Sequence, residues 1–130
     1  MKKADIKTKF FCGYVSLNDG EYYAVNSNDF VTDADFVNGV LASTAMPIVW
    51  PPVDTINTVN QPNNTQKQLV DGGVRNVSPL GDIIKEINND PANQYTIIII
   101  NCSSGEIAAE DYKEPACRQV ATLYATHKQH

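Results

Sequence analysis

The chain has 130 residues, of which 42% are hydrophobic, and its formal net charge is −5 at pH 7. A chain of this size and composition is expected to fold as one domain, residues 1–130, around one core. The acidic balance disfavours a nucleic-acid partner, because phosphate binding requires clustered lysine and arginine. Lysines gather only near the start of the chain, where residues 1–8 are expected to form a flexible tail.

The sequence also argues against a membrane-spanning helix, a signal peptide and a metal site. The longest strongly apolar run, Ile97–Ile100, is far shorter than the roughly 20 residues that a membrane-spanning helix needs. No hydrophobic stretch follows Lys2 and Lys3, so no signal peptide is expected and a cytoplasmic location is predicted. An odd number of cysteines indicates reduced thiols. Because no Cys or His pair has metal-ligand spacing, we expect neither a metal nor a cofactor.

The chain opens with a predicted hairpin and a helix. Residues 10–17 and 21–26 are strand-like and are separated by Asn-Asp-Gly, whose members tolerate the positive φ angles of a tight turn. A helix is expected next. Thr32 can cap its first turn, with Asp35 three residues later in the pattern of a capping box, and Pro47 ends it.

The middle of the chain alternates polar and apolar segments. Residues 54–66 are rich in Asn, Thr and Gln and predict a surface loop, with at most a short strand at its start. Residues 67–70 predict a strand. A second helix is expected to begin at Ser78-Pro79, with serine as its cap, and to bury an apolar stripe. That stripe consists of Leu80, Ile83, Ile84 and Ile87.

The last third of the chain predicts one more strand and one more helix. Residues 95–102 include four consecutive isoleucines, which are typical of a central strand covered on both faces in a parallel sheet. A final helix is expected over residues 115–126. Strands that alternate with helices in this way predict an α/β fold.

One carboxylate, Asp71, lies where a predicted strand meets two glycines. Asp71 ends the predicted strand 67–70 and is followed by Gly72 and Gly73. Taken alone, Asp-Gly between two strand-like runs indicates a turn. Two glycines also allow the strand end to bend sharply beneath the carboxylate, so Asp71 is a candidate general base. The neighbouring residues offer it no serine to activate.

Two linked segments carry a family resemblance. Residues 42–53 read ASTAMPIVWPPV, and residues 68–80 read QLVDGGVRNVSPL. Their order resembles the C-terminal part of the patatin-like phospholipase domain, over about residues 8–105. That family shows an AS-x-A-x-P element, an aromatic residue before Pro-Pro, and an apolar strand that ends in Asp-Gly-Gly or Asp-Gly-Ala. In this chain the aromatic residue is Trp50.

The resemblance implies a truncated patatin-like three-layer α/β/α sandwich and ester hydrolysis by a Ser–Asp dyad. In the family the serine lies in a G-x-S-x-G elbow, and a glycine-rich loop stabilises the oxyanion. This chain contains neither the elbow nor the glycine-rich loop. Ser103-Ser104-Gly105 is not an elbow, because it lacks the first glycine. Only Asp71 therefore has a catalytic counterpart, with Gly72 and Gly73 as backbone positions of its motif. We expect a chain that supplies the dyad aspartate and hydrolyses no ester alone.

Several alternatives stay open from the sequence. A different class of function is a non-catalytic interaction module that keeps the scaffold and lacks the chemistry. Trp50 fits an acyl pocket, although a half-buried core position is favoured. Ser43 is best explained by packing or capping, and Arg75 by a surface salt bridge rather than a phosphate head group. The expected partners are a lipid or ester substrate and a second copy of the chain, since a partial sheet leaves an open edge.

Overall fold

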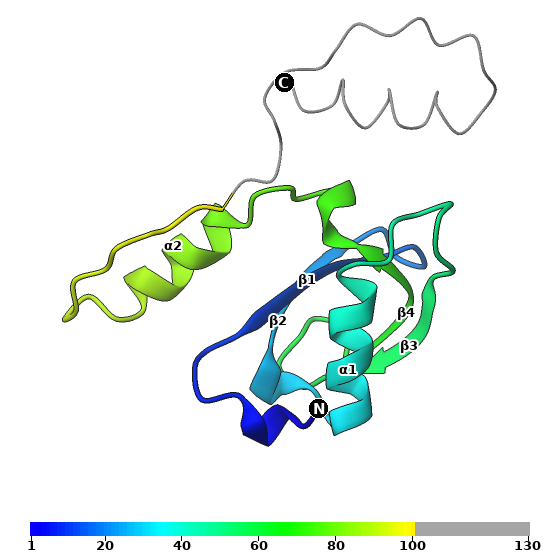
Figure 1. Cartoon of the computed structure of the whole chain (residues 1–130), viewed down its shortest axis with the longest axis horizontal. Coiled ribbons are helices and arrows are strands. Elements are labelled where there is room, and N and C mark those ends of the chain that lie inside the picture. Colours follow the sequence, from blue (N-terminus) through cyan, green and yellow to red (C-terminus); the bar gives the residue numbers. More distant parts are fainter. Residues whose placement is uncertain (101–130) are drawn as a thin grey trace, which may run out of the picture. The chain divides into compact units, whose positions relative to one another are not determined.

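The computed structural model describes residues 1–100 (Figure 1). The chain divides into two compact units, Met1–Pro91 and Ala92–His130. The helices and strands among the described residues all lie in the first unit. The strands are β1 (Phe11–Ser16), β2 (Tyr22–Asn26), β3 (Val53–Asn57) and β4 (Thr65–Asp71). The helices are η1 (Lys3–Asp5), η2 (Ser27–Asp29), α1 (Asp33–Ala42), η3 (Gly72–Val74) and α2 (Leu80–Asn88), with η marking a 3-10 helix.

The four strands form one sheet in the order β2-β1-β4-β3, and each neighbouring pair is antiparallel. The predicted hairpin is confirmed, with Val15 opposite Tyr22 and Phe11 opposite Asn26. The expected parallel sheet is not found among the described residues. Short connections join β1 to β2 and β3 to β4, and such connections allow only antiparallel pairing, because a parallel pair needs a crossover of a dozen or more residues. The fold of this unit is therefore α/β with an antiparallel sheet.

Part of the predicted loop 54–66 is a strand. Thr55 of β3 lies opposite Lys67 of β4, and Asn57 lies opposite Thr65, so only residues 58–64 connect the two strands. The short strand that the sequence allowed at the start of this segment is therefore present, and its composition is polar because only one of its residues, Ile56, is fully buried. Exposed positions of an edge strand accept polar residues, and a single inward side chain suffices to anchor it.

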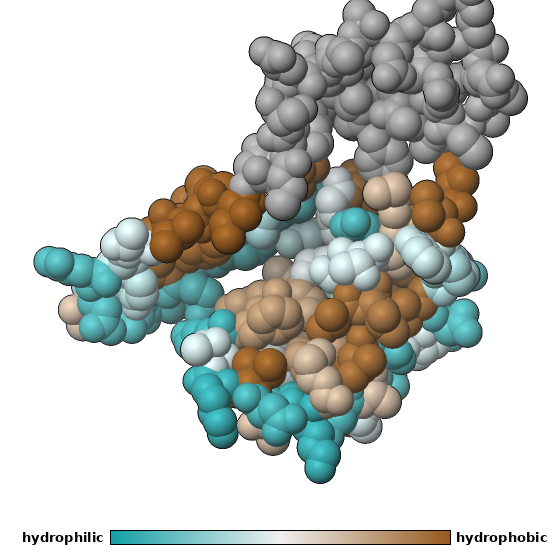
Figure 2. Space-filling model, viewed as in Figure 1, coloured by the Kyte–Doolittle hydropathy of each residue, from teal (hydrophilic) through white to brown (hydrophobic). Residues whose placement is uncertain are grey.

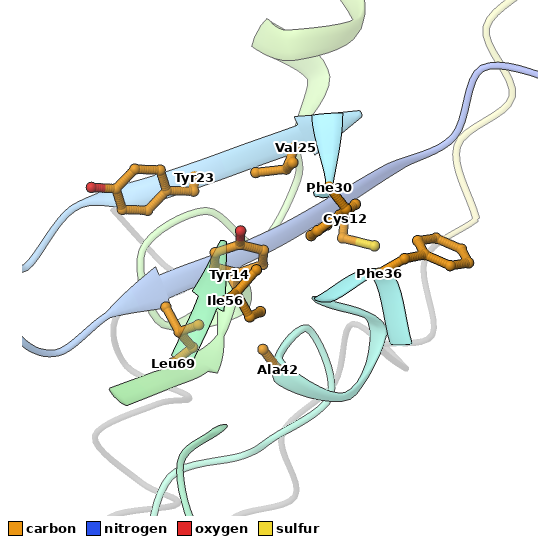
Figure 3. Packing of buried hydrophobic residues seen from close by; sticks show 9 residues of the cluster. All are labelled: Cys12, Tyr14, Tyr23, Val25, Phe30, Phe36, Ala42, Ile56 and Leu69. Carbon is orange, nitrogen blue, oxygen red and sulfur yellow. The ribbon is translucent and has the colours of Figure 1, made fainter. Parts of the chain in front are cut away.

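The core lies between one face of the sheet and α1 (Figure 3). Tyr14 and Tyr23 lie on neighbouring strands and stack with their ring centroids 6.0 Å apart. Phe36 of α1 packs against Phe30, and their ring centroids are 5.8 Å apart. Cys12 is buried beside them. Burial raises the pKa of its thiol to about 11, so the thiol stays protonated and unreactive. The nine buried residues of this cluster are Cys12, Tyr14, Tyr23, Val25, Phe30, Phe36, Ala42, Ile56 and Leu69.

The buried polar groups next to this core are paired. The Tyr14 hydroxyl donates to Gln66 Oε1 at 3.1 Å, and Gln66 Nε2 donates to the Thr58 hydroxyl at 2.7 Å. Burial raises the pKa of Tyr14 above its ordinary value, which keeps the hydroxyl a donor. This chain of hydrogen bonds joins β1 to the β3–β4 hairpin inside the unit.

The predicted capping box of α1 is confirmed. The Thr32 hydroxyl accepts the Asp35 N–H at 3.1 Å, and Asp35 Oδ2 accepts the Thr32 N–H at 3.0 Å. Asp35 Oδ1 also accepts the N–H of Asn57 in β3 at 2.8 Å. Burial alone would raise the pKa of Asp35, but the hydrogen bonds from Thr32 and Asn57 outweigh it, so the pKa lies below its ordinary value. One carboxylate thus completes the capping box of the helix and ties the helix to the sheet.

Some of residues 1–8, expected from the sequence to form a flexible tail, contact the rest of the unit. Lys3–Asp5 is a 3-10 turn, the Lys3 N–H donates to Asp33 Oδ1 at 2.9 Å, and the Lys3 ammonium donates to the Phe30 carbonyl at 2.6 Å. Ile6 packs against the core. Tertiary partners that are distant in the sequence therefore hold the segment in place.

Two predictions of burial in the second half of the chain are wrong. The apolar stripe of α2 is not buried, since Ile83 is 40% and Ile84 45% exposed. Its expected cap is also absent, because Pro79 precedes the helix and no side chain caps it. Residues 95–100 carry no strand, and Ile98 and Ile100 are 81% and 86% exposed. Branched side chains favour extended backbone, but a strand also needs a paired edge.

Other predictions lie outside the described residues. These are the end of the isoleucine strand at 101–102, the helix 115–126, the Ser-Ser-Gly segment 103–105, and the remaining cysteines at 102 and 117. Within residues 1–100, no helix is both long and apolar enough to cross a membrane.

Candidate active site

Asp71 lies at the end of β4, opposite Tyr14 of the central strand β1. Its N–H donates to the carbonyl of Ala45 at 2.9 Å. Ala45 belongs to the AS-x-A-x-P element and is itself buried. The two sequence segments that carry the family resemblance are therefore in direct contact, although 25 residues of chain lie between positions 45 and 71 in the sequence.

The two oxygens of the Asp71 carboxylate differ in their surroundings. Oδ1 accepts the N–H of Gly73 at 2.8 Å, which makes Asp71 the cap of the short helix η3. Oδ2 has no hydrogen-bond partner among residues 1–100, and the side chain is half-buried. The carboxylate is thus oriented by the backbone through one oxygen, and its second oxygen remains available to accept a proton.

Gly72 is required for a reason that the sequence did not reveal. A Cβ atom built on Gly72 would lie 2.5 Å from the carbonyl oxygen of Gly13 in β1 and 2.6 Å from its carbon. Such distances do not occur between real atoms of this kind, and both neighbours are backbone. Neither Gly72 nor Gly73 has a positive φ angle, so close approach and not left-handed backbone explains the first glycine.

Gly73 has a milder requirement. Its Cβ would lie 3.2 Å from Oδ1 of Asp71, and a side chain there would push against the oriented carboxylate. The turn that follows is closed by the N–H groups of Arg75 and Asn76, which both donate to the Gly72 carbonyl, at 3.0 and 2.8 Å. The close packing of this turn against β1 fixes the position of the Asp71 carboxylate at the end of β4.

The other sequence candidates take different roles. Trp50 is 62% exposed, so it is not the half-buried core residue that was favoured. Ser43 is the C-cap residue of α1, in agreement with a capping role. Arg75 Nη1 donates to the carbonyl of Gly20, and within residues 1–100 the expected salt bridge of Arg75 is not formed. Two ion pairs join carboxylates of α2 to exposed lysines, where Asp82 pairs with Lys85 at 3.8 Å and Glu86 pairs with Lys9 at 2.9 Å.

A separate hollow of about 330 Å³ lies along β2. Its walls come from the ends of the β1–β2 and β3–β4 hairpins and from α2, and Asp71 is not among them. Residues 1–100 contain no group of three or more His, Cys, Asp or Glu side chains placed to hold a metal ion. The lining residues of the hollow are Glu21, Tyr22, Tyr23, Ala24, Gln61, Pro62, Asp82 and Lys85.

These features describe a small α/β protein that presents one backbone-oriented carboxylate at a strand end. The family model for patatin-like phospholipase matches residues 10–84, which is more than half of the chain. The chain therefore belongs to the patatin-like phospholipase family. The matched span includes both resemblance segments and ends within α2. No curated protein and no solved structure gives a significant match.

Proposed function

We propose that Asp71 is the general base of a Ser–Asp dyad in a lipid acyl hydrolase, and that the serine and the oxyanion donors come from outside these 130 residues. Membership of the patatin-like phospholipase family supports the class of reaction. The observation that carries the residue assignment is the carboxylate geometry, with Oδ1 held by the Gly73 N–H and Oδ2 open to a donor. The absence of G-x-S-x-G from the chain supports an external nucleophile.

In this mechanism the serine oxygen attacks the ester carbonyl, and Oδ2 of Asp71 accepts the proton of the serine hydroxyl. The same proton then returns to the departing alcohol, and a water molecule activated by Asp71 hydrolyses the acyl-enzyme. A positioned general base contributes roughly 10²–10⁴-fold to such a reaction. Loss of the nucleophile of a serine hydrolase costs on the order of 10⁶ in turnover. The chain alone is therefore expected to hydrolyse no ester above background.

A complementation experiment tests this proposal. The chain is co-expressed with a patatin-like segment that carries the G-x-S-x-G elbow and a glycine-rich loop, and hydrolysis of a p-nitrophenyl ester is measured. Asp71→Asn, which keeps the size of the side chain and removes its basicity, is expected to lower the rate by roughly 10²–10⁴-fold. Asp54→Asn, at an exposed position of β3, is the matched control and should leave the rate unchanged. Hydrolysis by the chain alone, or full activity of complemented Asp71→Asn, would contradict the proposal.

We further propose that the complete domain is a three-layer α/β/α sandwich. In the described unit α1 packs on the face of the sheet that carries Tyr14, Tyr23 and Ile56. The opposite face, which carries the half-buried Tyr22 and Ala24, would receive the second helical layer.

The open edge of the sheet supports the self-association proposed from the sequence. In an antiparallel pair, every second residue of a strand turns its backbone N–H and C=O toward the neighbouring strand. Hydrogen bonds at both ends of the β1–β2 pair show which residues of β2 face β1, so the backbone groups of Tyr22, Ala24 and Asn26 point away from it. A charged residue or a proline in an edge strand protects it from pairing with another chain, and β2 contains neither. The opposite edge, β3, is partly covered, because the Val31 N–H donates to the Asn57 carbonyl.

We therefore expect the chain to form dimers through β2 at high concentration. Ala24→Lys places a charge on the edge and should give a monomer by light scattering, because edge lysines oppose strand pairing. Leu17→Lys adds the same charge at an exposed position outside β2 and should leave the association unchanged. A wild-type chain that stays monomeric at high concentration would contradict the proposal.

A further inference from the structure

The loop between α1 and β3 exposes an unusual set of side chains. Residues 42–53 contain no charged residue. Within this segment Met46 is 52%, Ile48 70% and Trp50 62% exposed, and Val49 between the last two is 62% exposed. The loop lies at the right of the coloured part of Figure 1, between α1 and β3, and hydrophobic atoms appear at the right edge in Figure 2. We call residues 46–50 the apolar loop.

The backbone of the apolar loop holds these side chains outward. The N–H groups of Val49 and Trp50 both donate to the Met46 carbonyl, at 3.2 and 3.0 Å, which closes a tight turn. Ile48 at its tip has a φ angle of +73°, a conformation that is a genuine outlier for a β-branched residue. A strained apolar residue kept exposed at the tip of a closed turn indicates a functional constraint rather than packing.

The apolar loop begins directly beside the candidate base. Ala45 immediately precedes it, and the Ala45 carbonyl accepts the N–H of Asp71 at 2.9 Å. A surface that docks on the loop therefore comes to lie next to the Asp71 strand end.

We propose that the apolar loop inserts into the interface of a phospholipid bilayer and thereby brings the surface that holds the substrate to Asp71. This inference rests on the function proposed above. Tryptophan prefers the boundary between head groups and acyl chains, and aliphatic side chains gain by burial beneath it. The loop has no charge to desolvate. Because the chain carries a net charge of −5, electrically neutral zwitterionic head groups are favoured over anionic ones.

A protein partner fits this surface less well than a bilayer does. A stable protein interface buries roughly 800 Å² on each partner and involves about 20–30 residues a side. The apolar loop offers five residues on a narrow turn, which is the shape of an insertion element and not of a flat interface. A second copy docked on the loop is a distinguishable outcome of the experiment below.

The chain contains its own probe, because Trp50 is its only tryptophan. Phosphatidylcholine vesicles are titrated into the full chain while Trp50 emission is followed. Insertion is expected to shift the emission to shorter wavelength, and lipids brominated on their acyl chains should quench it. Ile48→Asn keeps Trp50, and asparagine tolerates the positive φ angle. This variant is expected to weaken partitioning by about 10- to 100-fold, the contribution of one buried aliphatic side chain.

Val31→Asn is the matched control. Val31 is 51% exposed and lies before the opposite end of α1, so its replacement should leave partitioning unchanged. A Trp50 spectrum that vesicles do not change would overturn the inference. So would equal partitioning of Ile48→Asn and wild type, or a lipid-free spectral shift on raising the protein concentration, which would show a second copy on the loop.

The two proposals fail separately in this design. Asp71→Asn should bind vesicles as the wild type does, because it leaves the apolar loop intact. Vesicle binding without activity in the complementation experiment would remove the dyad proposal and keep the apolar loop as a bilayer-binding element. Activity in complementation without vesicle binding would overturn the loop inference alone.

Discussion

Replacing Gly72 with alanine is expected to lower the free energy of unfolding by about 3 kcal/mol, at the upper end of the usual cost of overpacking. The added Cβ would lie 2.5 Å from the Gly13 carbonyl oxygen, and both partners are backbone. No side-chain rotation can relieve this contact, so η3 or the end of β4 has to move away from β1. Urea denaturation followed by circular dichroism measures the loss.

Gly81→Ala is the matched control for this prediction. Gly81 lies in the first turn of α2, and a Cβ there meets nothing within 4 Å. Alanine is the better helix former by roughly 0.8–1.0 kcal/mol, so this variant should be neutral or more stable than the wild type. If Gly72→Ala and Gly81→Ala have equal stability, the close approach of η3 to β1 does not exist in solution.

Asp35→Ala is expected to destabilise the chain by about 3 kcal/mol. The variant loses the carboxylate that accepts the Thr32 N–H in the capping box of α1, and it leaves the N–H of Asn57 in β3 without the acceptor that lies 2.8 Å away. Because α1 leads directly into the segment that contacts Asp71, loosening this helix also loosens the candidate site. Thermal unfolding of the two chains at pH 7 measures the difference.

The same carboxylate predicts the direction of a pH effect. Hydrogen bonds from Thr32 and Asn57 hold the folded-state pKa of Asp35 below its ordinary value of 3.8, against the opposing effect of burial. Its contribution to stability is therefore fully present above pH 3.8 and is lost as the pH falls through the lowered folded-state pKa. The stability gap between wild type and Asp35→Ala should narrow over that acidic range.

Asp33→Ala controls for the general effect of charge at the start of α1. Asp33 is exposed in the first turn of the same helix, where a negative charge contributes about 0.3–1 kcal/mol through the helix dipole, and its Oδ1 also accepts the exposed Lys3 N–H at 2.9 Å. Its loss should be clearly smaller than that of Asp35→Ala. Equal effects of the two variants would mean that the bond from Asp35 to Asn57 does not stabilise the fold.

Both predictions concern the parts that hold the candidate base in place. Asp35 ties α1 to β3, and the residues after α1 provide the Ala45 carbonyl that receives the Asp71 N–H. Gly72 lets the next turn lie flat against β1 while Gly73 donates to the carboxylate. The site therefore depends on a helix cap and a close backbone contact that lie outside the reacting atoms.

The sequence alone determined the features that neighbouring residues encode. The β1–β2 hairpin follows from its Asn-Asp-Gly turn, and the start of α1 follows from the Thr32–Asp35 pair. The end of the strand at Asp71 and the order of the two family segments were also visible. Each of these depends on contacts within a few residues, so local chemistry is sufficient to predict them.

Only the tertiary structure decided which surfaces meet. The strand within the polar residues 54–66 depends on pairing with β4, and the exposure of the α2 stripe depends on what packs against it. The need for glycine at position 72 arises from Gly13, and the contact between Ala45 and Asp71 arises from the sheet. Burial, pairing and close approach join residues that are distant in the chain, and a pattern of apolar residues shows that a side chain can be buried without showing what will cover it.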